Sequence, residues 1–315
     1  MRVLAIGGTG FIGRFAVEAL ADAGHETIVF HRGSAPQGAA ARSITGDRRN
    51  LAEHAAELRA LAADVVIDFL LATGRQAEQL VEVFRGHTGR IVMLSSCDVY
   101  RAAGILHGTE PGEPDNSPIT EDSALRNHLH PYPPDAVRKL RAVFPWLEDD
   151  YDKIPAERAI LSGAVPGTVL RLPMIYGPGD PLHRFYPVIR EAEAGRATIA
   201  IEQGVAEWRG IRGYVEDVAW AVALAAMDDR AAGRVYNVGD PENFTELEWR
   251  RRIAQAAGWA GEFVVTPGET PRQHWVVDGS RIRRELGYRE RVDREEALRR
   301  TIAWERAHPP AGGAG

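Results

Sequence analysis

The sequence predicts an α/β fold in which a parallel β-sheet is covered by helices on both faces. Short apolar segments rich in β-branched residues alternate with longer segments whose apolar residues recur at helical spacing. The first short segment runs directly into a glycine-rich turn. This alternation is typical of parallel sheets, because each parallel connection has to cross back over the sheet before the next strand begins.

The glycine-rich turn indicates a nucleotide-binding loop. The apolar run at residues 2–6 is the expected first strand, and Gly7, Gly10 and Gly13 follow it. Gly7 permits the sharp turn, Gly10 lets the backbone approach a pyrophosphate, and Gly13 lets the next helix pack closely. The free N–H groups at the start of that helix would bind the phosphates. We therefore expect a doubly wound Rossmann sheet that binds a dinucleotide.

The other elements follow the same alternation. Strands are expected at residues 26–30, 43–45, 64–69, 90–94, 167–172, 235–238 and 262–266. Helices are expected at residues 50–61, 73–84, 181–195, 217–227, 245–257, 280–286 and 293–306. Asn50 with Glu53 and Thr245 with Glu248 are expected to form capping boxes, and Thr73 is expected to cap its helix. We expect residues 1–172 and 213–239 to form the nucleotide-binding domain. Residues 173–212 and 240–315 are expected to form a smaller, discontinuous C-terminal substrate lobe.

Composition limits the class of protein. The chain has 315 residues, 44% hydrophobic and 26% charged, with a net charge of −6, which argues against a general nucleic-acid binder. Cys97 is the one cysteine, so no internal disulfide is expected and a reducing, cytoplasmic compartment is favoured. The first expected strand leaves no room for a signal peptide, and no segment has the length of a membrane span or the spacing of a metal site. We expect a small-molecule substrate, no metal, and a homodimer as one option for assembly.

The end of the second strand bears on cofactor choice. In NAD-binding proteins an acidic residue there accepts hydrogen bonds from the ribose hydroxyls, but here the residues are His31, Arg32 and Gly33. Arg32 can instead pair with a 2′-phosphate, with Arg14 assisting, which favours NADP over NAD. A solvated surface arginine is the equal alternative.

The fifth strand runs into Ser95, Ser96, Cys97 and Asp98. Ligands of parallel sheets bind beyond the carboxyl ends of the strands, so these side chains are expected at the cofactor crevice. Cys97 is expected to be an inert core thiol.

Five segments together carry a family resemblance. They are the glycine turn at 7–13, Ser-Ser-x-x-Val-Tyr at 95–100, and the segments at 171–179, 214–219 and 236–239. In this order they resemble the extended short-chain dehydrogenase/reductases, the NAD-dependent epimerase/dehydratase group, over nearly the whole chain. The segments around Arg32 and Asp47 are similar to an atypical branch that includes chloroplast stem-loop-binding proteins.

The resemblance implies a nicotinamide cofactor along the carboxyl edge of the sheet. It places Asp47 at the adenine, Leu70 and Leu71 along the cofactor, and the turn from Pro173 over the nicotinamide. The complete expected cofactor-binding set is Gly7, Thr9, Gly10, Phe11, Ile12, Gly13, Arg32, Asp47, Arg48, Leu70, Leu71, Ser95, Lys153 and Pro173.

The family's catalytic pattern is Ser or Thr with Tyr-x-x-x-Lys, in which the lysine lowers the pKa of the tyrosine. Ser96 matches the hydroxyl position, but Tyr151 and Lys153 are two residues apart. Pro155 favours a helix that begins near residue 154, and an extended segment before it would place both side chains on one face. We therefore hypothesise that Tyr151 and Lys153 form the pair. In the competing interpretation Lys153 holds the ribose, and Asp149, Asp98 or no residue serves as the acid/base.

The predicted function is NAD(P)-dependent hydride transfer at a hydroxyl or carbonyl of a small substrate, including a sugar or sugar nucleotide. A dehydratase that uses Asp98 is one alternative, because family dehydratases have an acid at the position of Asp98, two residues before Tyr100. A non-catalytic NAD(P)-binding regulator or RNA-associated relative is another. Residues that could reach a substrate are His128, His130, Tyr132, Trp146, His183, Arg184, Arg209 and Arg212.

Overall fold

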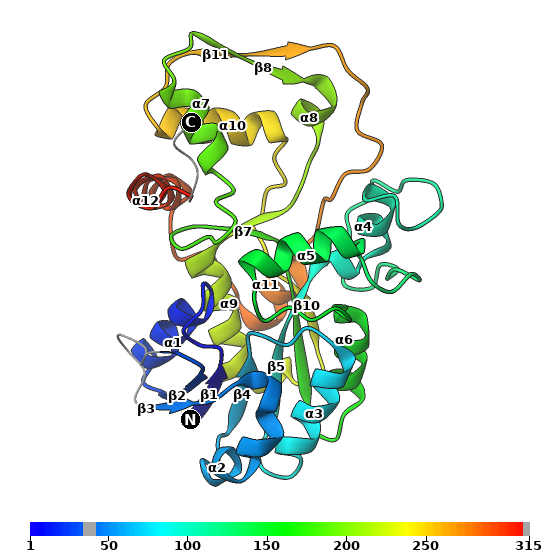
Figure 1. Ribbon diagram of the computed structural model, residues 1–315, viewed down its shortest axis with the longest axis vertical. Coiled ribbons are helices and arrows are strands. Elements are labelled where there is room, and N and C mark those ends of the chain that lie inside the picture. The colour runs from blue at the N-terminus through cyan, green and yellow to red at the C-terminus, as the bar shows by residue number, and fades with distance from the viewer. Residues whose placement is uncertain (34–41, 311–315) are drawn as a thin grey trace.

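The computed structural model describes residues 1–33 and 42–310, and within them the main element is a sheet of seven parallel strands (Figure 1). Its order is β10-β6-β5-β4-β1-β2-β3. The strands are β1 (Arg2–Ile6), β2 (Glu26–His31), β3 (Arg42–Thr45), β4 (Val65–Asp68), β5 (Arg90–Ser96), β6 (Gly167–Leu172) and β10 (Val235–Asn237). Strand order reverses between β1 and β4, which is where doubly wound folds form their ligand crevice.

Helices cover both faces of this sheet, as expected. One face carries α1 (Gly13–Asp22) and α9 (Val215–Met227), which pack on each other. The other carries η1 (Arg48–His54), α2 (Ala55–Ala60), α3 (Gly74–Phe84) and α6 (Lys153–Ser162). Successive strand residues contribute to two separate cores, Val3 to the first and Leu4 to the second, and both side chains are fully buried. The sheet is therefore buried on both faces, which explains its continuous apolar strands.

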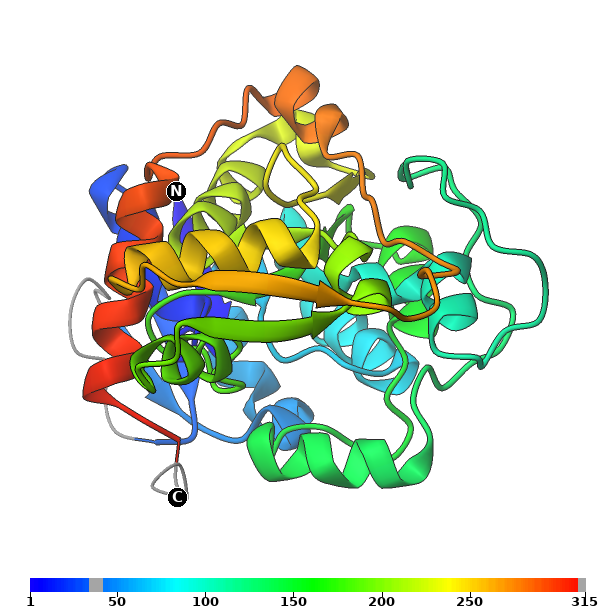
Figure 2. The same cartoon turned by 90° about the horizontal axis from the view of Figure 1, so that it is seen from above.

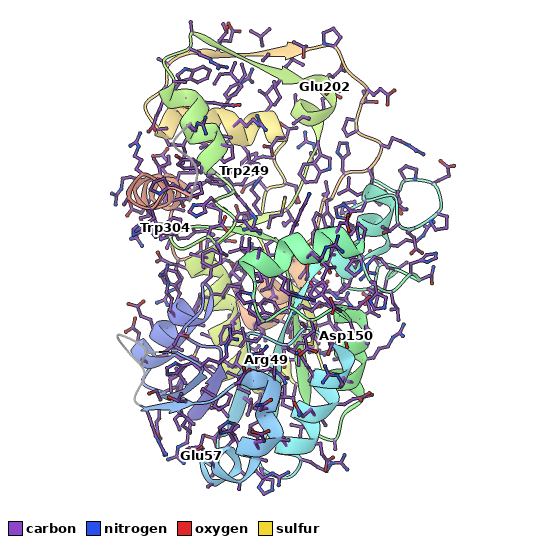
Figure 3. The ribbon with its side chains drawn as sticks, viewed as in Figure 1. Arg49, Glu57, Asp150, Glu202, Trp249 and Trp304 are labelled. Atoms are coloured by element: carbon purple, nitrogen blue, oxygen red, sulfur yellow. The ribbon has the colours of Figure 1, made fainter. Side chains whose placement is uncertain are left out.

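A smaller lobe lies beyond the carboxyl edge of the sheet (Figures 1 and 2). It contains α7 (Tyr186–Glu193), β8 (Thr198–Glu202), α8 (Gln203–Glu207), α10 (Glu246–Ala256) and β11 (Glu262–Thr266), with β8 paired to β11. Trp249 is fully buried on α10, and Figure 3 shows it within this lobe. The short pair β7 (Met174–Tyr176) and β9 (Arg212–Tyr214) lies between lobe and sheet, and α12 (Arg294–Ala307) packs against α7 and α10.

The proposed domain boundaries remain a prediction. One helix of the proposed substrate lobe, α11 (Ser280–Leu286), packs against β10 of the large sheet and the adjoining η3 (Asp229–Ala231). Tyr236 on β10 donates its hydroxyl to Glu285 of this helix at 2.9 Å.

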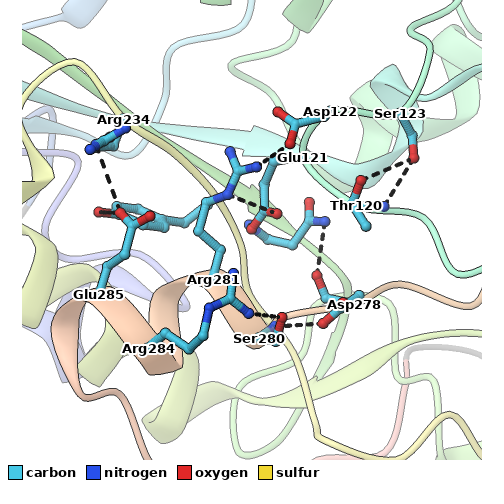
Figure 4. A network of polar contacts seen from close by, with 12 residues as sticks. Thr120, Glu121, Asp122, Ser123, Arg234, Asp278, Ser280, Arg281, Arg284 and Glu285 are labelled. Carbon is cyan, nitrogen blue, oxygen red and sulfur yellow. Dashed lines mark hydrogen bonds and ion pairs between the residues drawn. The ribbon is translucent and has the colours of Figure 1, made fainter.

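Between β5 and α6 the chain makes a long excursion that contains η2 (Cys97–Val99), α4 (Arg101–Leu106) and α5 (Pro134–Val143). Figure 4 shows how its middle is fastened: Arg281 of α11 pairs with Glu121 at 3.4 Å and with Asp122. The backbone N–H of Asn237 also donates to Glu121 at 2.9 Å. These contacts attach the excursion to the carboxyl end of β10.

Two local predictions are wrong. Asn50 and Glu53 form no capping box, because Asp47 caps η1 by accepting from the Arg49 N–H, and Asn50 has φ −107° and ψ 31°. The helix expected from residue 181 begins at Tyr186, because Asp180 accepts from the N–H groups of Leu182 and Arg184 and forms a turn first. The predicted cap at Thr73 and the capping box at Thr245 are confirmed.

A buried ion pair fixes the loop after β4. Arg48 and Asp68 are 4% and 0% exposed, and their side chains meet at 2.9 Å. Arg48 also donates to the Gln76 carbonyl at 2.9 Å, and Asp68 accepts from the N–H of Leu70 at 2.9 Å. The pair therefore joins η1 and α3 to the end of β4.

We predict that Arg48→Met lowers the free energy of unfolding by about 3–5 kcal/mol, because it leaves the buried Asp68 carboxylate without its cation. Arg49→Ala is the matched control, since the neighbouring Arg49 is exposed and pairs only with Asp47 among the described residues. It should leave the stability nearly unchanged. Urea unfolding of both variants tests this, and equal stabilities would contradict it.

Candidate active site

The glycine loop has the geometry that a pyrophosphate needs. Gly7 has φ +78°, and a Cβ there would lie 2.6 Å from Leu70 Cγ. A Cβ on Gly13 would lie 2.7 Å from the Gly7 carbonyl oxygen, whereas at Gly10 the nearest atom would be 3.4 Å away. In the described part of the chain no acceptor meets the N–H groups of Phe11 and Ile12, just before α1. These free donors at a helix N-terminus fit a dinucleotide phosphate, and Thr9 lies in the same turn.

The expected adenine end of the site contains two charged side chains, those of Arg32 and Asp47. Arg32 is exposed at the end of β2. Asp47 pairs with Arg49 at 2.6 Å, and that hydrogen bond, with a smaller effect from the Arg32 charge, holds the pKa of Asp47 below its usual value. The Arg48 guanidinium is buried with Asp68, so we interpret Arg48 as a residue that holds the loop rather than one that reaches a ligand.

Ser95 and Ser96 at the end of β5 face different surroundings. The Ser95 hydroxyl is buried and donates to Glu157 at 2.5 Å, and Glu157 pairs with Arg171 at 2.8 Å. The Ser96 hydroxyl is partly exposed and accepts from the Asp98 N–H at 3.2 Å. Of the two hydroxyls, only that of Ser96 is placed for a ligand. Burial raises the pKa of the Cys97 thiol, as expected of a core cysteine.

Lys153 is the first residue of α6. Asp152 caps the helix by accepting from the Ile154 N–H at 2.8 Å and has extended backbone, φ −160° and ψ 127°. The helix thus begins one residue before the expected position, so that Asp152 is extended but Lys153, expected to be extended, is helical. The Tyr151 N–H donates to the Glu148 carbonyl at 3.3 Å, after a turn. The Lys153 ammonium donates to the carbonyls of Leu71 and, at 3.1 Å, Leu94. Burial lowers its pKa to about 8.

Tyr151 shares this site, but its hydroxyl faces a carboxylate. The Lys153 Nζ lies 5.9 Å from the centre of the Tyr151 ring, and the Tyr151 hydroxyl donates to Asp98 Oδ2 at 3.2 Å. The Tyr132 hydroxyl donates to the same oxygen at 3.1 Å. Burial raises the pKa of Asp98 and those of both tyrosines. The arrangement is suited to proton exchange between a phenol and a buried carboxylate.

Tyr132 was not predicted as a member of this cluster. The sequence analysis named it only as one of eight residues that could reach a substrate. Trp146 from the same excursion lies 5.7 Å from Lys153 Nζ, and the backbone N–H of His130 donates to Asp152. No sequence spacing relates Tyr132 to Asp98, because their proximity depends on how the excursion folds back.

Asp149 lies away from the cluster. Its side chain is 89% exposed and pairs with Arg141 on α5. Of the two carboxylates proposed as alternatives to the tyrosine, the structure brings only Asp98 to Tyr151.

The candidate substrate-binding cations are engaged within the protein. Arg212 pairs with Glu246 at 2.5 Å and lies 5.0 Å from the Trp249 ring centre. His183 pairs with Glu305 at 2.7 Å. Of the two remaining arginines, Arg184 pairs with Asp180, and Arg209 donates to the Asn243 carbonyl.

In residues 1–33 and 42–310 there is no cluster of three or more side chains arranged for a metal ion. Over the same residues, no helix is both long enough and apolar enough to span a bilayer.

We predict that Gly13→Ala weakens dinucleotide binding by roughly tenfold or more, because the new methyl group collides with the Gly7 backbone and displaces the loop. Gly279→Ala is the control, since a Cβ there would meet only the Asn237 carbonyl oxygen, at 3.5 Å, and a second carbonyl at the limit of contact. Calorimetry with NAD⁺ and NADP⁺ measures the effect. Unchanged affinity in Gly13→Ala would show that no phosphate binds at this loop.

Comparisons with known proteins show the family of the chain. Residues 3–239 match the model of the NAD dependent epimerase/dehydratase family. A dTDP-glucose 4,6-dehydratase from an Actinoplanes species is 27% identical, over 98% of each chain. A dTDP-6-deoxy-L-talose 4-dehydrogenase (NAD(P)(+)) from Kitasatospora kifunensis is 27% identical, over 95% of this chain and 93% of the relative.

Among solved structures, a short-chain dehydrogenase/reductase superfamily protein from Agrobacterium tumefaciens with bound NAD has the same fold. Its TM-score is 0.70 at 18% identity, over 98% of each chain. The structural similarity shows the fold, and the family match over residues 3–239 shows the class of enzyme. The chain belongs to the NAD-dependent epimerase/dehydratase family and is an NAD(P)-dependent enzyme of the short-chain dehydrogenase/reductase type.

Proposed function

We propose that this enzyme moves a hydride between the nicotinamide and a hydroxyl or carbonyl carbon of a sugar nucleotide, as an oxidoreductase or epimerase. The observation that carries the proposal is the Tyr151 hydroxyl on Asp98 Oδ2, beside Lys153, at the end of β5. The sugar-nucleotide class rests on the names of the two relatives, which match nearly the whole chain.

The residues that would hold the cofactor follow the carboxyl edge of the sheet. The free N–H groups before α1 suit the pyrophosphate, and Leu70 and Leu71 follow β4. Pro173 follows β6 and packs beside Gly213. When bound, the nicotinamide would supply the hydride acceptor or donor. Lys153, fixed by two carbonyls, would bind ribose hydroxyls and add positive charge near Tyr151.

Tyr151 and Asp98 would handle the proton. An isolated phenolate is disfavoured here, since burial raises the pKa of Tyr151 and the Asp98 charge adds to that effect. The phenol can instead take the proton of a substrate hydroxyl while it passes its own proton to Asp98 Oδ2. In the reverse direction Asp98 returns a proton to the phenol, and the phenol protonates a substrate carbonyl oxygen. No free phenolate accumulates in either direction.

We propose NADP as the preferred cofactor. Arg32 at the end of β2 is exposed, and the described part of that turn offers no acidic side chain to the ribose. A guanidinium there can bind a 2′-phosphate.

A dehydratase is the second candidate. Asp98 Oδ1 is buried and has no hydrogen-bond partner among the described residues, which leaves this carboxyl oxygen free for a substrate proton. Dehydration is redox-neutral overall. Incubation with dTDP-glucose distinguishes the candidates, because a dehydratase releases water without accumulating reduced cofactor, a dehydrogenase accumulates reduced cofactor, and an epimerase does neither.

We predict that Tyr151→Phe lowers kcat by roughly 10²–10⁴-fold, because the substrate oxygen loses its proton donor and acceptor. A panel of dTDP- and UDP-hexoses with NAD⁺ and NADP⁺ identifies the substrate used for the measurement. Cofactor affinity, measured by calorimetry, should stay unchanged in the variant. Full turnover by Tyr151→Phe would refute the proposed role.

We predict that Arg32→Ala raises the Kd for NADP⁺ by roughly tenfold and leaves that for NAD⁺ unchanged, because only NADP⁺ carries the 2′-phosphate. Arg42→Ala is the matched control. Arg42 is also exposed, and it lies beside Ile28, at the opposite end of the neighbouring strand β3. Equal losses for both cofactors, or none, would remove the argument for NADP.

A further inference from the structure

We propose that Tyr132 is a positioning residue that holds the Asp98 carboxylate ionised and oriented for proton exchange with Tyr151. This inference rests on the proposed function, because it assigns Asp98 as the partner of the reacting phenol. It concerns a residue of the excursion between β5 and α6, outside the family's Tyr-x-x-x-Lys pattern.

The geometry around Asp98 is asymmetric. Asp98 is 1% exposed, and its Oδ2 accepts from Tyr132 at 3.1 Å and from Tyr151 at 3.2 Å. The two rings stack with centroids 6.1 Å apart and an interplanar angle of 22°. The second oxygen, Oδ1, has no partner in the described part of the chain. Two phenols therefore supply all the hydrogen bonds that the carboxylate receives from described side chains.

Among the residues that the structure describes, no cation contacts the carboxylate directly. Arg126 donates instead to the backbone carbonyl of Asp98 at 2.6 Å, and its charge is matched by Asp152 at 3.3 Å. Lys153 donates to two backbone carbonyls. The titratable and charged groups around Asp98 are Arg126, Tyr132, Tyr151, Asp152, Lys153, His107 and Cys97. Burial raises the pKa of Asp98, the Arg126 charge lowers it most, and the hydrogen bond from Tyr132 lowers it next, ahead of the Lys153 charge. Tyr132 is thus the group in direct contact with the carboxylate that most favours its ionised form.

The excursion around Tyr132 is anchored by Asp152, the residue that caps α6. Asp152 accepts from the His130 N–H at 2.6 Å, pairs with Arg126 and caps α6. Arg126 in turn donates to the His128 carbonyl at 2.5 Å. On its other side the Tyr132 ring lies 5.9 Å from that of His107. The position of Tyr132 is thus set by the same contacts that position Tyr151 and Lys153.

This arrangement matters while Tyr151 exchanges a proton with a substrate oxygen and with Asp98. Tyr132 donates to Oδ2 independently of Tyr151 and keeps a hydrogen bond on the carboxylate. Without that second donor, the buried carboxylate would take up a proton at higher pH and would no longer accept one from Tyr151.

The test is the titration of Asp98 in Tyr132→Phe. Hydrogen bonds to a carboxylate lower its pKa, so removing the Tyr132 hydroxyl should raise the pKa of Asp98 by roughly one unit. The measurement is carbon NMR of protein labelled at the aspartate carboxyls, with Asp98→Asn assigning the signal. Tyr236→Phe is the matched control, because it removes a tyrosine–carboxylate hydrogen bond, from Tyr236 to Glu285, and leaves both phenols on Asp98 in place.

Activity supplies a second readout. In the direction of hydroxyl oxidation Asp98 accepts a proton only when it is ionised, so kcat/KM measured in that direction falls as the pH drops through the pKa of Asp98. With the substrate found in the hexose panel, the acid limb of the profile should move to higher pH in Tyr132→Phe and stay in place in Tyr236→Phe. Thermal unfolding of both variants separates this shift from loss of the fold.

The outcomes are distinguishable. An unchanged Asp98 titration in a folded Tyr132→Phe protein overturns the inference, whatever the substrate proves to be. If Tyr151→Phe keeps full turnover although the Asp98 titration moves, the hydrogen bond is real but the proposed function fails, and with it the catalytic role of Tyr132.

Discussion

The buried ion pair between Arg126 and Asp152 is the interaction on which the site depends. Both side chains are almost fully excluded from solvent, 1% and 2% exposed, so each charge relies on the other and on surrounding hydrogen bonds. Asp152 also caps α6, and Arg126 contacts the backbone of Asp98. One pair therefore connects three separate segments: the turn after β5, the excursion and the start of α6. Breaking it would leave a buried charge and release all three.

The electrostatic environment explains why an altered tyrosine–lysine spacing is compatible with chemistry. Burial acts in opposite directions on the two groups, raising the pKa of Tyr151 and lowering that of Lys153 to about 8. A phenolate next to an ammonium is thus not the stable state of this site. A phenol next to a carboxylate can move a proton without creating an isolated phenolate, and Asp98 supplies that carboxylate.

Most of the fold could be predicted from the sequence, because local patterns determine it. The strands of the large sheet read as apolar runs, and the glycine turn and Thr245 cap follow from backbone geometry. The capping box expected at Asn50 was wrong, because the helix is capped three residues earlier, by Asp47, whose side chain accepts from the Arg49 N–H. Pro155 predicted a helix that begins near residue 154, one residue after the observed start at Lys153. The catalytic pairing of Tyr151 with Lys153 remains a prediction. Tyr132 and the role of Arg48 depend on long-range packing, which leaves no local pattern.

The pairing of Arg212 with Glu246 has a consequence for how a phosphate-bearing ligand would be recognised. The guanidinium is already balanced by a carboxylate and stacked near Trp249, yet its Nη1 is buried without a hydrogen-bond partner among the described residues. A phosphate arriving there would meet little net positive charge. It would gain from a directed hydrogen bond rather than from long-range attraction, so ionic strength would have little influence on recognition at this arginine.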